Sequence, residues 1–578
     1  MEPRQDFKLY IIDANAPLFN TRFSKNRTVN WSKAPFEHLE RGGTIDKSVS
    51  TRVLQEYKNY VEQVALLGYN AISLDDVAHL VSIDFYPQKL RNTISDYKAF
   101  YSKFFDIASR LNLKIFLTTD IMFYNNYIDT YTRNKDSHNI HLLSIALKRL
   151  FKEFPQVNGV IFRIGESDGI DVHGEFNSRL IIKRPAQARR YIQSLLPVFE
   201  SYNRLLIFRT WTLGAYPIGD LMWNPDTYHA VFDKITSKNF VISLKYGDTD
   251  FHRHLHLSPL FFESSHKKII ELQTRREYEG FGEFPSFVGF DYEKYYSQLS
   301  SCNSLIGIYA WCQTGGWSRF TRLSFQNKSS LWNELNTNAA IDIFRCGKSA
   351  EKAVEDFASR YFPDNDPSLL LRLVKLSDIV VKDLWYLPEY SRRTLYFRRI
   401  RIPPLFWVFW DTIIINHFVR KILRRFVHNR DEAIKEGYRA LYKIKEIRRL
   451  GMQLGMDEQM FDFYFDTFEI LALAREYFLG PWSPGLNIKI EKIIEHYERK
   501  YPSGFKIEKD FSPLTIRSFI IKAVFRMCLR PHAHYRPIDK FFLIKFTGWF
   551  YPLIKNIQHH RFPEFADKQA MGTQVLFK

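Results

Sequence analysis

GVIFRIGESDG (residues 159–169) joins an apolar run directly to a cluster of charged side chains. The run 159–162 has the continuous apolarity of a strand that is buried on both faces of a parallel sheet. Arg163, Glu166 and Asp168 follow at once, where such a strand would end. A solvated turn is one explanation for this charge, and an active-site rim at the mouth of a core element is the other.

Seven further apolar runs of the same kind occur in the first 340 residues. They lie at 8–13, 71–74, 114–119, 205–211, 240–246, 286–290 and 305–311. Amphipathic segments typical of helices separate several of them, at 52–67, 95–111, 141–153 and 186–200. Eight strand–helix units that close on themselves form a (β/α)8, or TIM-type, barrel, and we predict this α/β fold. A doubly wound open sheet is the alternative that the pattern leaves open.

After about residue 340 the periodicity becomes helical, and Pro and Gly residues separate the helical stretches. These stretches lie at 349–361, 368–385, 405–427, 431–450, 457–478, 487–500 and 513–529. We therefore predict two domains, a barrel at residues 1–340 and a basic, aromatic-rich α-helical domain at 341–578.

The formal net charge of +19 favours an acidic partner. The candidates are nucleic acid, anionic lipid and an acidic oligo- or polysaccharide, and no recognition motif supports nucleic acid. The four cysteines have neither metal-site nor disulfide-framework spacing, and the N-terminal stretch does not resemble a secretory signal. We therefore expect a cytoplasmic protein with reduced thiols and no required cofactor. The oligomeric state stays open.

In a (β/α)8 barrel, the chemistry lies on the loops after the carboxyl ends of the strands. Polar or aromatic residues follow nearly every predicted strand. They are Asp13, Asn15, Asp75, Asp76, Asp120, Arg163, Glu166, Asp168, Arg209, Trp211, Lys245, Asp248, Asp250, Gln313 and Trp317. Because these ends meet at one mouth, the clustering predicts an active site there.

The residue types at this mouth suit glycoside hydrolysis, which needs one protonated carboxylic acid and one carboxylate on opposite sides of the bond. Glu166 is a candidate acid and Asp250 a candidate base. Arg163, Arg209 and Lys245 end consecutive strands. They form either a salt-bridge network with the nearby acids or a pocket for the carboxylate of a uronic acid.

Two other sets of side chains are less distinctive. Three alternating histidines in DFHRHLH (250–256) would share one face of an extended segment, but suitably spaced Cys or carboxylate partners are missing, so we assign no metal site. By composition alone, Glu271, Glu277 and Glu279 in IELQTRREYEG (270–280) are ordinary surface carboxylates.

LKYGDTDFHRHLHLSPLF (244–261) and IIELQTRREYEG (269–280) together resemble the hallmark segment of the family 67 glycoside hydrolases, the α-glucuronidases. The matching positions are Lys245, Gly247, Asp250 and Phe251, then 258–261, then Glu271, Gln273, Glu277, Tyr278 and Gly280. The stretches at 66–77, 154–169, 206–211 and 349–362 resemble further segments of that family in the same order. The similarity covers roughly residues 8–362.

The resemblance implies an inverting hydrolysis of an α-linked glucuronic or related uronic acid. It implies that Asp250 and Glu277 activate water and that a glutamate after the fourth strand protonates the leaving oxygen. The family's Asp-Ser-Glu-Gly resembles 166–169 with its carboxylates exchanged, so either Glu166 or Asp168 is the acid, and we prefer Glu166. The family's N-terminal β-domain has no counterpart ahead of the first strand pattern.

The same resemblance implies the substrate contacts of the site. Arg163, Arg209 and Lys245 match positions that hold the uronic acid in the family. We add Trp211 and Trp317 as stacking surfaces and Asp76 as a further substrate contact, because they also follow barrel strands.

The segment 403–430, PPLFWVFWDTIIINHFVRKILRRFVHNR, combines an aromatic run with a basic end. It is either a core helix of the second domain or an interfacial helix on anionic lipid, and 541–557 offers a second such surface. The alternative function is therefore a non-hydrolytic, membrane-associated protein for glycan binding or polysaccharide assembly. It would sit peripherally at the inner face of the membrane.

Overall fold

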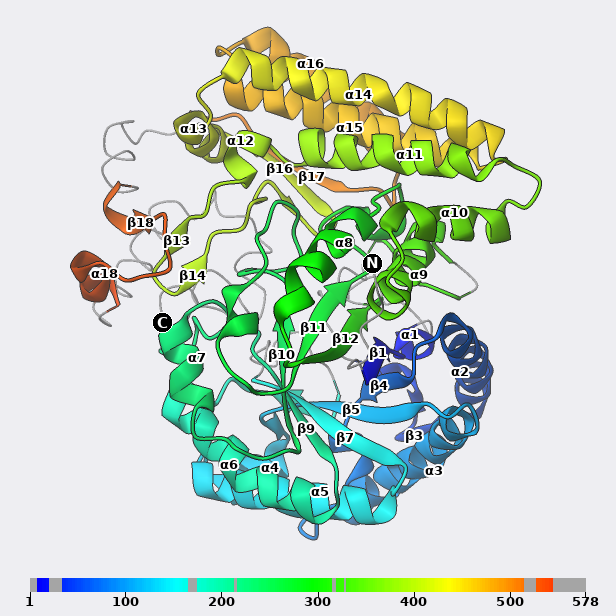
Figure 1. Ribbon diagram of the computed structural model, residues 1–578, viewed down its shortest axis with the longest axis vertical. Helices are drawn as coiled ribbons and strands as arrows, with labels where there is room; N and C mark the ends of the chain where they lie inside the picture. The colour runs from blue at the N-terminus through cyan, green and yellow to red at the C-terminus, as the bar shows by residue number, and fades with distance from the viewer. Residues whose placement is uncertain are drawn as a thin grey trace.

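The computed structural model describes residues 8–19, 34–164, 174–212, 216–313, 319–326, 329–513 and 526–543. Its centre is a closed barrel of eight parallel strands, with helices around the outside (Figure 1). The strands are β1 (Leu9–Asp13), β4 (Ala71–Asp75), β5 (Lys114–Asp120), β7 (Val157–Arg163), β9 (Leu205–Arg209), β10 (Phe240–Lys245), β11 (Lys268–Gln273) and β12 (Leu305–Trp311). They neighbour one another in chain order, and β12 closes on β1. The predicted (β/α)8 barrel is thus confirmed.

The strand sequences explain why the ring closes. Nearly every strand residue is buried, because side chains fill the inside and helices cover the outside, which suits continuous apolar runs. Gly307 lies where β12 meets β1. A Cβ atom at this position would lie 1.8 Å from the carbonyl oxygen of Leu9, so only glycine permits this approach.

The barrel helices are α2 (Lys47–Leu67), α3 (Gln88–Arg110), α5 (Asp136–Glu153), α6 (Pro185–Ser201), α7 (Pro225–Phe232), α8 (Gly289–Gln298) and α9 (Leu331–Cys346). The four predicted barrel helices are present as α2, α3, α5 and α6; three of them begin five to seven residues earlier than predicted, and α7, α8 and α9 were not predicted. Shorter elements on this part of the chain are α1 (Ala16–Phe19), α4 (Asn126–Thr132), the β2–β3 pair (Glu40–Arg41, Thr44–Ile45) and the β6–β8 pair (Phe123–Tyr124, Asn177–Ser178). Helix α9 runs across residue 340, where the sequence predicts the domain boundary. That division stays a prediction.

The predicted strand at 286–290 is wrong. This segment is a buried loop that leads into α8, and the seventh strand is β11. The loop satisfies its backbone with side chains instead of a neighbouring strand: the Val288 N–H donates to Asn336, and the Phe287 carbonyl accepts from Arg253. The apolar pattern does not predict β11, because polar residues interrupt its apolar run.

The C-terminal region is mainly helical. It contains α10 (Ala350–Tyr361), α11 (Pro367–Val380) continuing as a π-helical turn η6 (Val381–Trp385), α12 (Pro388–Ser391), α13 (His417–Phe426), α14 (Arg430–Gln453), α15 (Glu458–Leu479), α16 (Pro484–Lys500) and α18 (Pro537–Phe542). Figure 1 shows α11, α14, α15 and α16 stacked beside the barrel. The two parts share one hydrophobic core, in which Phe284 of the barrel part stacks on Tyr464 of α15 with ring centroids 5.2 Å apart.

The predicted helix at 405–427 is wrong over its first half. That stretch forms β15 (Val408–Phe409) and β16 (Thr412–Asn416), which pair with each other, and β16 also pairs with β17 (Lys506–Asp510). The β-branched run Ile413–Ile415 favours a strand, and the partner strand lies about ninety residues away in the chain. A second small sheet joins β13 (Tyr396–Phe397), β14 (Ile400–Arg401) and β18 (Leu529–Arg530).

This result also corrects the predicted interfacial helix at 403–430, of which only α13 is helical. Two of its cations face the protein: Arg420 and Arg424 donate to the carbonyl of Gly480 at the end of α15. Membrane contact through this segment stays a prediction. The predicted helix at 513–529 and the surface at 541–557 fall largely on residues outside the described ranges. Among the helices described, none is both long and apolar enough to cross a membrane.

Candidate active site

Every barrel strand ends in a charged, amide or indole side chain. In chain order these last residues are Asp13, Asp75, Asp120, Arg163, Arg209, Lys245, Gln273 and Trp311. All eight are buried, and the parallel strands place them at one end of the barrel. The polar cluster that the sequence predicts at the carboxyl ends of the strands is therefore real, and it is largely shielded from solvent.

Arg209 is held by a carboxylate inside the barrel. Its Nε and Nη2 atoms donate to the two oxygens of Glu271, at 2.9 Å each. Glu271 also accepts from the Ser243 hydroxyl at 2.7 Å and the Trp311 indole at 3.2 Å. Burial raises the pKa of Glu271, but Arg209 outweighs burial and holds that pKa below its ordinary value. Glu271 is therefore an interior anion and not a surface carboxylate.

Lys245 and Asp250 form the next pair around the ring. The Lys245 ammonium lies 2.5 Å from Asp250 Oδ1, and the Tyr278 hydroxyl donates to Oδ2 at 2.8 Å. Burial raises the pKa of Asp250, but Lys245, together with His252 and Tyr278, holds it below its ordinary value. Asp250 is therefore an ionised carboxylate at neutral pH.

Two aromatic rings fix the position of Lys245. Its ammonium lies 3.3 Å from the ring centroid of Trp211 and 4.4 Å from that of Phe251. One face of Trp211 is thus occupied by a cation, so the predicted stacking on a sugar is left with the opposite face. Lys245 has three N–H donors, and Asp250 is the one hydrogen-bond acceptor that it contacts among the described residues.

Glu277 is held by an amide and has a different environment. The Gln273 side chain at the end of β11 donates to Glu277 Oε1 at 2.6 Å and accepts from the Glu277 backbone N–H at 3.0 Å. Glu277 immediately precedes Tyr278, which donates to Asp250. The loop after β11 therefore brings Glu277 to the same end of the barrel as Lys245 and Asp250.

Arg163 lies among acids from the neighbouring strands. Its Nε lies 3.0 Å from Asp120, and its Nη2 lies 3.8 Å from Asp75. Burial raises the pKa of Asp75, and Arg163 opposes this shift. Asp76 contacts the His79 ring at 2.8 Å. The three cations predicted to hold a substrate carboxylate thus each have a carboxylate partner within the protein.

Asp13, at the end of β1, is bound differently from the other acids. Its Oδ1 accepts from the backbone N–H of Cys312 at 2.8 Å and contacts Cys312 Sγ at 2.9 Å. Burial raises its pKa to about 7. Within the described part of the chain, Asp13 forms no ion pair within 4 Å, although Arg275 interacts with it at longer range.

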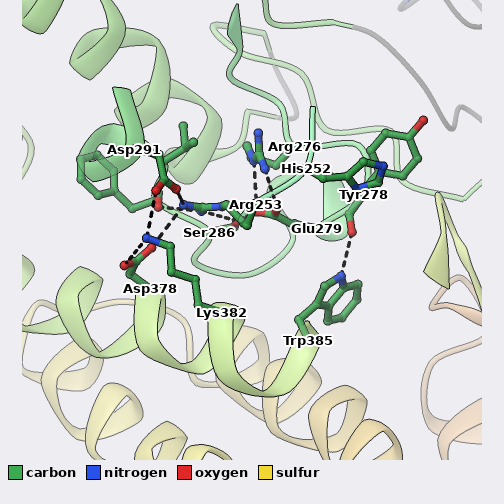
Figure 2. A network of polar contacts seen from close by, with 12 residues as sticks. His252, Arg253, Arg276, Tyr278, Glu279, Ser286, Asp291, Asp378, Lys382 and Trp385 are labelled. Carbon is green, nitrogen blue, oxygen red and sulfur yellow. Dashed lines mark hydrogen bonds and ion pairs between the residues drawn. The ribbon is translucent and has the colours of Figure 1, made fainter. Parts of the chain in front are cut away.

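A buried ion network joins the loop after β11 to the helical region (Figure 2). Arg253 contacts Glu279 at 3.1 Å, Asp291 at 2.5 Å and Asp378 of α11 at 3.2 Å. Arg276 also pairs with Glu279, and the Trp385 indole donates to the carbonyl of Tyr278 at 2.8 Å. The helical region therefore supports the backbone on both sides of Glu277 and Tyr278.

Sequence reasoning missed Arg253, which is the centre of this network. Its acidic partners are remote in the chain, so no local spacing reveals them. The sequence signal that could have identified Arg253 was its position between the histidines of 250–256, inside the segment that resembles the glycosidase family. His252 packs on Tyr278 with ring centroids 4.3 Å apart, and His254 contacts the carbonyl of Lys382 at 3.2 Å. Over the described ranges, no group of three His, Cys, Asp or Glu side chains is arranged to hold a metal ion.

The structure thus brings together Asp250, Glu277, Lys245, Arg209 and Arg163 at the carboxyl ends of neighbouring strands. Glu166, Asp168 and Trp317 lie outside the described residues. The catalytic and binding roles of all these residues stay predictions.

No protein-family model matches the sequence, and no curated protein matches it either. Among solved structures, the barrel is similar to a GH138 enzyme targeting the pectin rhamnogalacturonan II, with a TM-score of 0.50 and 12% identity. The match covers 87% of this chain and spans 62% of the length of that enzyme. CpGH84B matches with a TM-score of 0.41 and 10% identity, over 86% of this chain and 74% of its own. An O-GlcNAc hydrolase mutant from Thermobaculum terrenum matches with a TM-score of 0.36 and 10% identity, over 88% and 95%. At such identities the likeness shows the fold alone.

Proposed function

We propose that this protein is a glycoside hydrolase resembling the α-glucuronidases, which releases an α-linked glucuronic or related uronic acid from an acidic glycan with inversion. One observation carries the proposal: Asp250 and Glu277 come from the loops after adjacent strands β10 and β11, and Tyr278 joins the two loops. The fold likeness to a pectin-targeting enzyme is compatible with this substrate class.

Asp250 suits the role of a base. Lys245 and Tyr278 keep it ionised, so it can accept a proton from a water molecule held between it and Glu277. Gln273 fixes the Glu277 carboxylate beside this water. The water oxygen attacks the anomeric carbon, and Glu166 or Asp168 protonates the leaving oxygen on the opposite side of the sugar.

The carboxylate of the sugar would bind chiefly at Lys245. This ammonium is fixed by Trp211 and Phe251 and keeps N–H donors that Asp250 does not use. Arg209 and Arg163 already pair with Glu271 and Asp120. In this proposal each arginine contacts the substrate carboxylate while it keeps its carboxylate partner in the protein.

The test is to incubate the protein with uronic-acid oligosaccharides and follow the released sugar by proton NMR. Release of a β-configured uronic acid from an α-linked substrate supports inverting hydrolysis. Release of the α-anomer contradicts inversion. Binding without cleavage favours the non-hydrolytic glycan-binding alternative, and a neutral oligosaccharide of equal length serves as the control for charge.

A further inference from the structure

A pocket of about 740 Å³ lies on the rim of the barrel, and none of its lining residues belongs to the candidate active site. The segments that line it follow β5, β7 and β9 along the chain. They include the N-terminal ends of α5 and α6, which face the carboxyl ends of the strands. The pocket therefore lies at the same end of the barrel as the candidate active site.

The lining of this pocket is strongly positive. It contains four cations, Arg179, Lys183, Arg184 and Arg190, and one carboxylate, Asp136. Arg190 pairs with Asp136 at 3.3 Å, and Arg179 donates to Asp129 at 2.5 Å. In the part of the chain that the structure describes, neither Lys183 nor Arg184 pairs with a carboxylate. Two guanidinium or ammonium groups in the lining are thus available to an anion.

The segment that carries these two cations is ordered by its own hydrogen bonds. The Lys183 backbone N–H donates to Gln187 at 2.9 Å, and its ammonium lies 4.9 Å from the ring centroid of Tyr216. Gln187 and Tyr191 also bind Asp136, at 2.8 and 3.2 Å. Asp136 is therefore engaged by several partners, while Lys183 and Arg184 lie exposed in the pocket lining.

We infer that this pocket is a second subsite, which binds another acidic sugar of the same glycan. The inference rests on the proposed function and extends it from the released sugar to the rest of the substrate. A chain whose end reaches Asp250 leaves the mouth across the rim, where Lys183 and Arg184 meet a further carboxylate. A concave pocket suits a sugar carboxylate better than a polynucleotide, which needs a continuous cationic track and open aromatic faces.

The experiment compares a galacturonic acid pentamer with maltopentaose by isothermal titration calorimetry. The Lys183→Ala/Arg184→Ala variant should bind the acidic pentamer about tenfold more weakly than the unaltered protein, with affinity for the neutral pentamer unchanged. Both residues are exposed, so folding is not at risk. The matched control is Lys148→Ala/Lys152→Ala, which removes the same charge from exposed positions toward the opposite end of α5. Its affinity for both pentamers should match that of the unaltered protein.

Three results with the variants would overturn the subsite: unchanged affinity of the Lys183/Arg184 variant for the acidic pentamer, an equal loss of affinity for both pentamers, or an equal loss of affinity in the control variant. Two results with the unaltered protein would overturn it as well. They are tighter binding of a single-stranded oligonucleotide than of the acidic pentamer, and no binding of the acidic pentamer at all. Failure of the proposed function looks different: the unaltered protein would bind the acidic pentamer through these cations and hydrolyse no uronic-acid oligosaccharide. Hydrolysis together with unchanged affinity of the variant would remove the subsite and keep the hydrolase.

Discussion

The barrel mouth and the junction with the helical region are both rich in buried charge, yet they are built differently. At the junction, Glu279 is saturated: it accepts from Arg253, Arg276, Ser286 and Tyr386. At the mouth, Lys245 contacts one hydrogen-bond acceptor among the described residues, and two of its three N–H donors meet no acceptor there. The comparison teaches that burial and charge alone do not mark a functional site. The two regions differ instead in how completely their described side chains are paired.

Glu277 and Glu279 lie two positions apart in the chain and have contrasting partners. Glu279 lies between two guanidinium groups, which hold its pKa well below the ordinary value although burial opposes them. Glu277 is held by the neutral amide of Gln273. Glu279 is anchored to the helical region through Arg253 (Figure 2). The Glu277 side chain contacts the last residue of β11 instead, at the carboxyl end of the barrel.

The largest effect is expected at the mouth. Asp250→Asn should lower kcat by about three orders of magnitude or more, because the base that accepts the proton of water is gone. The fold should persist, since an amide fills the same space. Steady-state rates on a uronic-acid oligosaccharide, with circular dichroism as the fold control, measure this. Retained turnover would remove Asp250 from the mechanism.

At the junction, the effect should appear in stability. Arg253→Met should lower the free energy of unfolding by about 3–5 kcal/mol, because Glu279, Asp291 and Asp378 lose a buried partner. Urea denaturation followed by fluorescence measures the change. A loss below about 1 kcal/mol would show that the network is not what holds the two parts together.

Asp13 is a buried acid at the mouth that forms no ion pair within 4 Å among the described residues, and it should produce a pH dependence. Its pKa is about 7 in the folded protein and near 3.8 when exposed, so its stabilising contribution is complete at low pH and is lost as the pH rises toward 7. In the Asp13→Asn variant this loss disappears. The stability of the variant relative to the unaltered protein should therefore rise by about 1 kcal/mol per pH unit between pH 5 and 7.

Calorimetric unfolding at several pH values measures this slope. Parallel stability curves for the two proteins would show that Asp13 is ionised throughout, and that its contacts with Cys312 stabilise the charged form.

The smallest effect is expected at the edge of the junction. Lys382 pairs with Asp291 at 3.1 Å and Asp378 at 2.9 Å, but Arg253 still bridges both acids without it. Lys382→Ala should therefore cost about 1 kcal/mol in unfolding free energy and leave kcat unchanged. A loss as large as that of Arg253→Met would mean that Lys382 and Arg253 act as one unit.

Local sequence was enough to predict seven of the barrel strands, because an apolar run buried on both faces is a strong signal. It failed at β11, where Lys268, Glu271 and Gln273 interrupt the run, and at 286–290, an apolar loop buried by side-chain hydrogen bonds. It also failed at 408–416, where the β-strand depends on a partner at 506–510. In each case the deciding contact is remote in the chain.

The sequence by itself determined the alternation of buried strands with helices and the polar residues that follow the strands, because both are local properties. The tertiary structure decided that the sheet closes into a barrel, because closure depends on the pairing of β12 with β1. The tertiary structure alone decided how those charges are paired. It placed Glu271 against Arg209, Glu279 between Arg253 and Arg276, and Asp250 as the one acceptor of Lys245 among the residues that the structure describes. Pairing depends on distances across the ring and on burial, and neither is written in the spacing of residues along the chain.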